Sequence, residues 1–273
     1  MLGKCLENVK KKTPLIHNIT NYVTVNDVAN ALLASGGSPI MSDEPDDVSD
    51  ITSICGGLNI NIGTLNKRSI EAMFVAGKKS KELGHVVLLD PVGAGASKLR
   101  TEIALEIMEG IKPDVIRGNI SEIKTLASGS GTTKGVDADV ADIVTEENLD
   151  SMVIFAKEFS KKAGAVIAIT GAIDLVADSK RCFVIRNGLP IMSRITGTGC
   201  MLSALATAYA VANPDSITEA VASSVCLMGL AGEIGTANMK ENEGNSSLRN
   251  HIIDAIYNMD AEILTKGAKY EVR

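Results

Sequence analysis

The stretch His85-Val-Val-Leu-Leu-Asp90, followed at once by Pro91-Val-Gly-Ala-Gly95, decides the class of fold. Its run of consecutive apolar residues is typical of a strand that is buried on both faces, as the strands of a parallel sheet are. In open α/β sheets, ligands bind beyond the carboxyl ends of the strands. The stretch therefore predicts a parallel α/β sheet with Asp90 facing a ligand crevice.

Similar apolar runs alternate with amphipathic helical segments on both sides of this stretch. We expect strands at 38–41, 58–62, 85–90, 114–117 and 165–170, and helices from 25 to the glycines at 36–37 and at 67–83, 99–110, 147–163, 198–213, 216–238 and 247–266. This alternation predicts right-handed βαβ units in a three-layer αβα fold, with a mainly parallel sheet and helices on both faces. Asp174 to Arg186 instead predicts a hairpin, turning at Ser179-Lys180-Arg181, at an antiparallel edge of the sheet.

The chain reads as one domain over residues 1–273, because no linker rich in Pro, Gly and Ser divides it. Ser128 to Asp139, rich in Gly, Ser and Thr, is the one loose segment, and we interpret it as a surface loop or a mobile flap.

The composition argues against several classes of protein. A net charge of −6, no Trp and only four Tyr and four Phe disfavour a nucleic-acid partner. Five cysteines without Cys-x-x-Cys spacing argue against disulfides or zinc and favour a cytoplasmic protein. Met1 to Lys12 lacks the apolar core of a secretion signal. Ile195 to Pro214 is uncharged, but its threonines and glycines favour a buried helix over a membrane span.

Thr196-Gly-Thr-Gly-Cys200 opens a long apolar helix and is the strongest local signal. Glycines allow successive N–H groups to converge, and the helix dipole adds positive charge there. Gly197, Thr198 and Gly199 are thus predicted to form an anion hole for a phosphoryl group in transfer. The alternative is an ordinary glycine-rich turn.

Cys200 lies in the first turn of this predicted helix, where a thiol pKa of about 8.5 tends to fall. It could be a buried structural cysteine, a covalent nucleophile, or a group that orients or deprotonates a substrate hydroxyl. A nucleophilic cysteine needs a histidine partner. His85 begins a strand and His251 lies within the last helix, so His17 is the histidine that stays open as a partner.

Asp90 and Glu122 follow neighbouring predicted strands and could hold magnesium, which takes few protein carboxylates. Arg117 also follows a strand, and its planar guanidinium suits a phosphate. The alternatives are a helix cap for each carboxylate and a surface ion pair for the arginine. The sequence has no P-loop motif, and Gly93-Ala-Gly95 is only a weak imitation of a nicotinamide-binding turn.

In this order, the motifs are typical of one family. The chain resembles the hydroxyethylthiazole kinases of the ribokinase-like superfamily over essentially its whole length. The resemblance is carried by Pro14-Leu-Ile-His-Asn-Ile-Thr-Asn-Tyr-Val-Thr24, Ser38-Pro-Ile-Met-Ser-Asp43, Asn61-Ile-Gly-Thr-Leu65, Asp90-Pro-Val-Gly-Ala-Gly95, Arg117-Gly-Asn-Ile-Ser-Glu122 and Gly197-Thr-Gly-Cys200. Six segments in the right order are far more specific than any one of them.

The resemblance implies an ATP-dependent kinase that phosphorylates the primary alcohol of 4-methyl-5-(2-hydroxyethyl)thiazole in thiamine salvage, with Mg²⁺ as cofactor. It also implies roles for individual residues. These are Asn21, Val23, Met41, Gly63, Thr196 and Gly197 in the thiazole pocket, Arg117 and Thr170 at the ATP phosphates, Asp90 and Glu122 at magnesium, Gly197 to Gly199 in the anion hole, and Cys200 facing the substrate hydroxyl.

Ribokinase-like enzymes usually carry Asp at the position of Cys200, and Cys is an option within the thiazole kinases. General-base help is worth about 10²–10⁴ in rate, but phosphoryl transfer depends mostly on positioning and charge stabilisation. Our hypothesis is that Cys200 orients the alcohol and accepts its proton late, if at all. The resemblance further implies a homotrimer in which N-terminal pocket segments meet the metal and phosphate groups of a neighbouring chain.

Three other functions stay open at this point. A hydroxymethylpyrimidine kinase would share Asp90, Asn119, Glu122 and the anion hole, although residues 18–41 favour the thiazole. A catalytically silent binding protein would have no chemical need for these groups. A cysteine hydrolase would depend on Cys200.

Overall fold

The computed structural model describes residues 1–129 and 143–273, and in them one sheet has the strand order β2-β1-β3-β4-β5-β6-β7-β8-β9. The strands are β1 Leu15–Ile19, β2 Ser38–Met41, β3 Gly57–Asn61, β4 Val86–Asp90, β5 Val115–Asn119, β6 Val166–Thr170, β7 Asp174–Ala177, β8 Cys182–Ile185 and β9 Tyr270–Val272. β1 to β6 pair in parallel, and β7 to β9 continue the sheet in antiparallel pairs. The predicted, mainly parallel sheet is confirmed.

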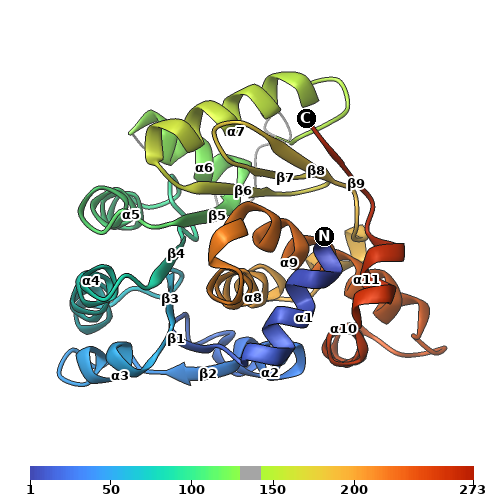
Figure 1. Cartoon of the computed structure of the whole chain (residues 1–273), viewed down its shortest axis with the longest axis horizontal. Coiled ribbons are helices and arrows are strands. Elements are labelled where there is room, and N and C mark those ends of the chain that lie inside the picture. Colours follow the sequence, from blue (N-terminus) through green and yellow to red (C-terminus); the bar gives the residue numbers. More distant parts are fainter. Residues whose placement is uncertain (130–142) are drawn as a thin grey trace.

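Helices cover both faces of this sheet (Figure 1). They are α1 Leu2–Lys12, α2 Val25–Ser35, α3 Val48–Ile54, α4 Lys67–Glu82, α5 Lys98–Gly110, α6 Ile120–Ser128, α7 Leu149–Ala163, α8 Thr198–Ala212, α9 Ile217–Ala237, α10 Asn245–Asn258 and α11 Ala261–Gly267. One apolar core lies between the sheet and the layer that contains α1, α2 and α8 to α11. A second core lies between the sheet and α3 to α7. The three-layer αβα architecture is therefore confirmed.

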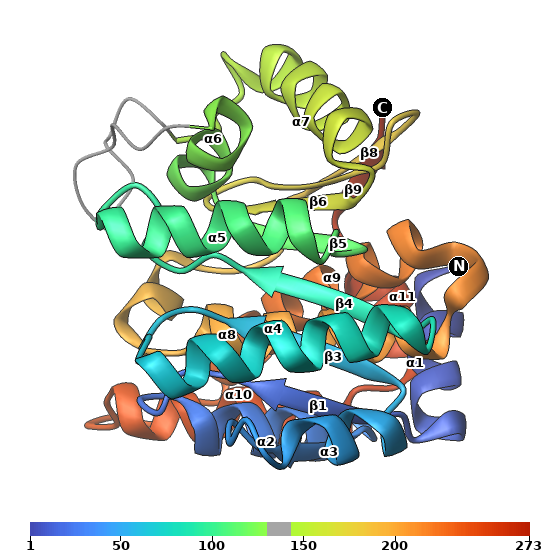
Figure 2. The ribbon, with the colours of Figure 1, turned by 90° about the vertical axis from the view of Figure 1, so that its left-hand side faces the viewer.

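α8 is the helix that positions the candidate site. It is buried along nearly its whole length, because it packs on β1, β3 and β4 on one side and on α9, α1 and α2 on the other. Its first turn lies beside the carboxyl ends of these strands, since Cys200 contacts Asn61 at the end of β3. Figure 2 shows β1 and β4 running in the same direction, so their carboxyl ends meet at one edge of the sheet.

The predicted α8 segment is thus a buried helix, as its threonines and glycines indicated. In the part of the chain that the structure describes, Pro214–Ala237 is long and apolar enough to cross a membrane, with a mean hydropathy of 1.4. However, 78% of its most apolar window is buried inside the fold. It is the segment of α9, which packs against α8 and α10.

Several elements differ from the predictions. The helix predicted over 247–266 is divided into α10 and α11, because the carboxylate of Asp260 accepts the N–H of Ile263 at 2.7 Å and caps a new helix. The hairpin of β7 and β8 is confirmed, but it does not form the edge of the sheet, because β9 pairs outside it. In the predicted loose segment, Ser128 ends α6 and Gly129 caps it, and residues 130–142 lie outside the described residues.

Candidate active site

A cavity lies where the order of the strands reverses. The connection that leaves β1 runs to β2 on one side, and the connection that leaves the neighbouring strand β3 runs to β4 on the other side. Such a reversal is the usual place for a ligand in this kind of fold. Cross-strand register brings Asn61 opposite Asp90, and Asn119 opposite Thr170, at the carboxyl ends of their strands. The cavity has a volume of ≈ 340 Å³ and is lined by Asn21, Val23, Thr24, Gly63, Thr64, Asp90, Val92, Arg117, Asn119, Glu122, Thr196, Gly197, Gly199 and Cys200.

Asp90 ends β4 and is completely buried. Its Oδ2 accepts hydrogen bonds from Nδ2 of Asn61 at 2.7 Å and from Oγ of Ser203 at 2.8 Å, and lies 3.7 Å from Nη1 of Arg117. Burial raises the pKa of Asp90, against the opposing effects of Arg117 and the two hydrogen bonds. Its Oδ1 is buried with no hydrogen-bond partner among the described residues, which leaves one carboxylate oxygen open to a ligand.

Glu122 is the second carboxylate in the cavity, and it is held by backbone groups. Its Oε2 accepts the N–H of Asn119 at 2.8 Å, as part of the capping box that begins α6, and its Oε1 accepts the N–H of Gly93 at 2.8 Å. Burial, followed by the nearby charge of Asp90, raises the pKa of Glu122 to about 7.

These two carboxylates fit a hydrated magnesium ion. The charge of Asp90 makes ionisation of Glu122 less favourable, and a divalent cation at the open oxygen of Asp90 would relieve that repulsion. Magnesium takes one or two carboxylates and completes its shell with water and phosphate. Among the described residues no three His, Cys, Asp or Glu side chains are grouped to hold a metal by themselves.

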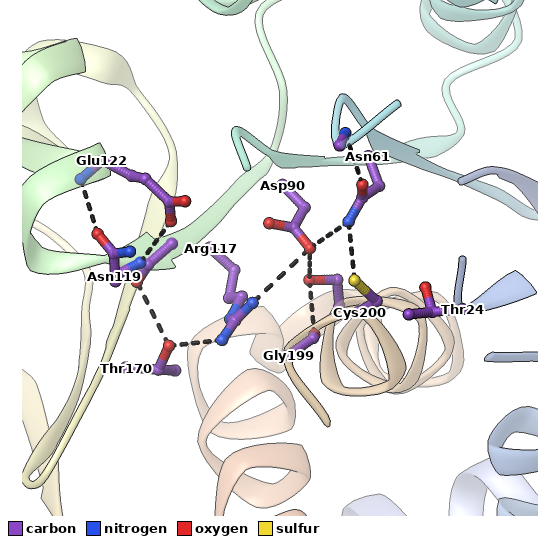
Figure 3. A network of polar contacts seen from close by, with 12 residues as sticks. Thr24, Asn61, Asp90, Arg117, Asn119, Glu122, Thr170, Gly199 and Cys200 are labelled. Carbon is purple, nitrogen blue, oxygen red and sulfur yellow. Dashed lines mark hydrogen bonds and ion pairs between the residues drawn. The ribbon is translucent and has the colours of Figure 1, made fainter. Parts of the chain in front are cut away.

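Arg117 lies between Glu122 and Thr170 on one side and Asp90 and the first turn of α8 on the other (Figure 3). Its Nη2 donates to Oγ1 of Thr170 at 2.6 Å. A side chain at position 199 would place its Cβ only 2.6 Å from Nη1 of Arg117, so glycine lets the guanidinium lie directly against the helix. The arginine therefore adds a fixed positive charge to the positive end of α8.

Gly197 is the N-cap of α8 and has a φ of 93°, which favours glycine. A Cβ at this position would lie 2.6 Å from Cγ2 of Thr24. No side chain caps α8, and the first N–H groups of a helix lack partners within the helix. The turn around Thr198 can therefore present these N–H groups to an anion, as the predicted anion hole requires.

Cys200 is held by two asparagine side chains. Its Sγ accepts from Nδ2 of Asn21 at 3.1 Å and from Nδ2 of Asn61 at 3.4 Å. Burial and the charge of Asp90 raise the pKa of the Cys200 thiol and outweigh the hydrogen bonds and Arg117. The expected fall of this pKa at a helix start is therefore wrong, because burial and a neighbouring carboxylate dominate. A raised pKa favours the neutral thiol over the thiolate.

The histidines do not activate this thiol. His17 makes one ring contact with Oγ1 of Thr52 at 3.0 Å and another with the carbonyl oxygen of Ser42 at 2.9 Å. His251 contacts Glu243. Within residues 1–129 and 143–273, no hydrogen bond joins a histidine to Cys200, and the cysteine hydrolase loses its main support.

Most of the predicted site residues share this cavity. Thr170 and Thr198 lie just outside its lining, at Arg117 and in the first turn of α8. Met41 is further away, since it ends the edge strand β2 and packs against the core beneath the α8 layer.

The sequence reading missed Asn61, Ser203 and Thr24 as site residues. The signal for Asn61 was present, because Asn59 and Asn61 alternate with apolar residues in the predicted strand. The alternation was read only as a strand pattern, although polar side chains in a strand buried on both faces require partners. Ser203 and Thr24 gave no such signal.

Comparisons with known proteins agree with this geometry. The model of the hydroxyethylthiazole kinase family matches residues 6–262. Curated proteins named hydroxyethylthiazole kinase from Clostridium acetobutylicum and Clostridium tetani are 60% and 47% identical, over 99% and 97% of this chain and 99% and 95% of theirs.

Solved structures extend the likeness to three dimensions. A hydroxyethylthiazole kinase from Pyrococcus horikoshii has a TM-score of 0.88 at 32% identity, covering 100% of this chain and 98% of that one. A pyridoxal kinase from Staphylococcus aureus, with a TM-score of 0.62 at 14% identity over 95% of this chain and 98% of its own, shares the fold alone. From the family match and these identities, the chain belongs to the hydroxyethylthiazole kinase family.

Proposed function

We propose that this chain transfers the terminal phosphoryl group of ATP to the primary alcohol of 4-methyl-5-(2-hydroxyethyl)thiazole, giving the thiazole phosphate and ADP in thiamine salvage. The observation that carries the proposal is a single cavity in which Asp90, Glu122 and Arg117 face the positive end of α8, next to Cys200. The substrate is supported by the 60% identity to a protein named hydroxyethylthiazole kinase.

The alcohol end of the cavity is formed by Asn21, Val23, Gly63 and Thr196 around the thiol of Cys200. Val23 offers an apolar surface to the ring, and the asparagine holds the sulfur in place. Because its pKa is raised, Cys200 favours the thiol form, which can orient the hydroxyl, and little thiolate is available to act as a base. Phosphoryl transfer tolerates this, since its loose transition state depends on alignment and charge stabilisation.

The phosphate end consists of Arg117, Thr170 and the N–H groups at the start of α8. The guanidinium and these amides bind the charge of the terminal phosphoryl group and keep it in line with the alcohol. Magnesium at Asp90 and Glu122 would neutralise further phosphate charge. Because Arg117 and the start of α8 are fixed in place before the substrates bind, the site needs little reorganisation during phosphoryl transfer.

We also propose that the enzyme is a cytoplasmic homotrimer. Val23, which lines the cavity, and its neighbour Tyr22 are 59% and 75% exposed, and adjacent exposed apolar side chains can mark an interaction surface. A neighbouring subunit could cover them. Asn21 and Val23 line the cavity of their own chain, so a shared site would be completed by other residues, with Met41 as one candidate. The cytoplasm is supported by the five free cysteines.

Magnesium-dependent ADP release by the purified protein tests the reaction, with the thiazole alcohol, hydroxymethylpyrimidine and simple sugars assayed in parallel. We expect turnover with the thiazole alone. Turnover only with hydroxymethylpyrimidine or a sugar would reject the substrate and keep the kinase. Binding of ATP without turnover of any alcohol would favour a silent binding protein. Sedimentation of a fully active monomer would reject the trimer.

The role of Cys200 is tested by Cys200→Ser and Cys200→Asp. If the residue orients the alcohol, both variants retain phosphoryl transfer within about 10²-fold, since each keeps a polar group at the position. A Cys200→Asp variant with sharply impaired transfer and unchanged substrate binding would contradict this role. Iodoacetamide labelling that leaves turnover unaffected would contradict any role for the thiol.

A further inference from the structure

Asn61 makes four hydrogen bonds, to four different segments of the site. Its Nδ2 donates to Oδ2 of Asp90 at 2.7 Å and to Sγ of Cys200 at 3.4 Å. Its Oδ1 accepts from Nδ2 of Asn21 at 3.1 Å and from the backbone N–H of Gly63 at 2.9 Å. A primary amide has two donors and two acceptor positions, so the bonding capacity of Asn61 is fully used.

The direction of these bonds is fixed by groups that cannot reverse. The N–H of Gly63 can only donate, so Oδ1 of Asn61 must face it and the amide nitrogen must face Asp90. Asn21 then has to present its own nitrogen to Asn61, which leaves its oxygen to accept the hydroxyl of Thr24 at 3.1 Å. A directed chain of donors thus runs from Thr24 through both asparagines to the carboxylate.

This chain also determines how Cys200 presents its thiol. Both Asn21 and Asn61 direct N–H groups at Sγ, which therefore acts as an acceptor on that side. The S–H hydrogen of the neutral thiol must point away from the two amides. Cys200 and its third polar neighbour Thr24 both line the cavity, so the S–H is left to point to the side of the Thr24 hydroxyl and the cavity, where the alcohol oxygen would lie.

We propose that Asn61 is a positioning residue for phosphoryl transfer, which sets the orientation of the Cys200 thiol and of the Asp90 carboxylate with one amide. The inference rests on the proposed kinase reaction. Asn61 itself is 1% exposed and does not line the cavity, so it acts through its neighbours. Its two donors align the groups of the reaction, and its two acceptors hold the Asn21 and Gly63 segments of the alcohol pocket.

Asn59 provides a matched control two residues earlier on β3. It is completely buried and lies on the same face of the strand, because successive side chains alternate. Its Nδ2 donates to Oδ1 of Asn18 at 3.1 Å, and Asn18 in turn donates to the carbonyl oxygen of Ile16. This second asparagine pair lies in the interior and includes no residue that lines the cavity. Asn59 makes this one side-chain hydrogen bond, and its Oδ1 has no partner among the described residues, so its loss removes a buried amide without touching the bonds of the site.

The test compares steady-state kinetics of Asn61→Ala and Asn59→Ala with the thiazole alcohol and MgATP. We expect kcat of Asn61→Ala to fall about 10²-fold, because misplacement of aligned groups by about 1 Å has an effect of this size. Its KM for ATP should stay within about threefold, since Asn61 is bonded neither to Arg117 nor to the N–H groups at the start of α8. The kcat of Asn59→Ala should also stay within about threefold. Equal losses of kcat in the two variants, or a loss confined to KM for ATP, would overturn the proposal.

A second readout does not depend on turnover. Shifts in melting temperature are measured for each asparagine variant alone and combined with Cys200→Ala. The shift of the double variant should equal the sum of the two single shifts when Cys200→Ala is combined with Asn59→Ala, and should differ from the sum when it is combined with Asn61→Ala. The reason is that, of these two asparagines, Asn61 is the one that contacts the sulfur. Additive shifts for both pairs would reject the Asn61–Cys200 contact, whatever the alcohol substrate proves to be. If Asn61→Ala does not fold, Asn61→Ser is measured in the same way. A wild-type protein without kinase turnover would reject the proposed function and leave this readout intact.

Discussion

Strand β3 has two equally buried faces with opposite chemistry. Leu58 and Ile60 are completely buried in the core shared with α4. Asn59 and Asn61 are 0% and 1% exposed on the other face, toward α8. Burying a polar group is unfavourable unless it is hydrogen-bonded, so the face toward α8 contributes less to folding than the face toward α4. The polar face is explained by the proposed reaction at the carboxyl end of β3, where Asn61 is hydrogen-bonded to Asp90 and Cys200.

The largest effect is expected for Asp90→Asn, because Asp90 on β4 is in register with Asn61 and extends the polar face of β3. We expect kcat to fall about 10³-fold or more, because the open carboxylate oxygen for magnesium is lost. The melting temperature of the metal-free protein should stay the same or rise, because the raised pKa of Asp90 means that its ionised form is unfavourable in the fold. ADP release and thermal melts measure the two effects. A variant within tenfold of wild-type activity would show that Asp90 is no metal ligand.

Leu89, the residue before Asp90 on β4, lies on the apolar face of the sheet and should behave in the opposite way. Leu89 is completely buried against the α4 and α5 layer, and Leu89→Ala should lower the free energy of unfolding by about 3 kcal/mol. Its kcat at 20 °C should remain within about threefold, because the folded fraction keeps its site. Urea unfolding and kinetics on the same preparation decide this. An intact stability with a large loss of kcat would invalidate the contrast between the faces.

A smaller effect is expected at the other end of the polar face, where α8 approaches β3 most closely. A Cβ at Gly57 would lie 2.5 Å from Cγ2 of Val211. Gly57→Ala should therefore reduce the free energy of unfolding by about 1–3 kcal/mol through overpacking. Gly110→Ala is the control, since a Cβ there meets nothing within 4 Å. Equal stability of the two variants would mean that α8 can move away from the sheet.

The smallest effect concerns His17, a polar residue of β1 on the side of α3. Burial lowers its pKa below the ordinary histidine value of about 6.5, against the opposing effects of the Ser42 carbonyl and Asp47. The unfolded chain therefore binds the proton more readily, so the contribution of neutral His17 to stability is complete above pH 6.5 and is lost as pH falls below it.

Thermal melts at pH 7.5 and 5.5 measure this effect. The wild type should lose more stability between the two pH values than His17→Gln does. Kinase turnover of His17→Gln should stay within about threefold, because both ring nitrogens are bonded away from Cys200. A complete loss of turnover would restore the cysteine–histidine pair as a hypothesis.

The fold could be predicted from the sequence wherever a run of apolar residues, or an apolar pattern with the period of a helix, is long enough. Val86 to Asp90 and the long apolar helices have such runs. β1 was missed as a strand because His17 and Asn18 interrupt its apolar pattern, and their partners are distant in the sequence. The break at Asp260 depends on one capping side chain, and β9 exists because β8 leaves an edge unpaired.

For the site, the sequence predicted residues that stand directly after apolar runs, such as Asp90 and Arg117. It could not predict the position of Met41, because this depends on β2 lying at the outer edge of the sheet. The role of Asn61 depends on bonds to residues up to 139 positions away, and a local pattern does not carry such information. The predicted fall in the pKa of Cys200 is wrong for a similar reason. The sequence shows that the residue begins a helix, but it does not show that the thiol is desolvated beside Asp90.

The surroundings of the half-buried Cys200 also determine how quickly the enzyme is oxidised. Peroxides attack the thiolate form of cysteine, and a thiol with a lowered pKa is therefore oxidised most readily. A cysteine that opens a helix would ordinarily be such a target. Here the pKa is raised and Sγ is held by two amides, while the other four cysteines are buried. The enzyme should therefore lose activity to hydrogen peroxide slowly, and more slowly still when the alcohol occupies the cavity.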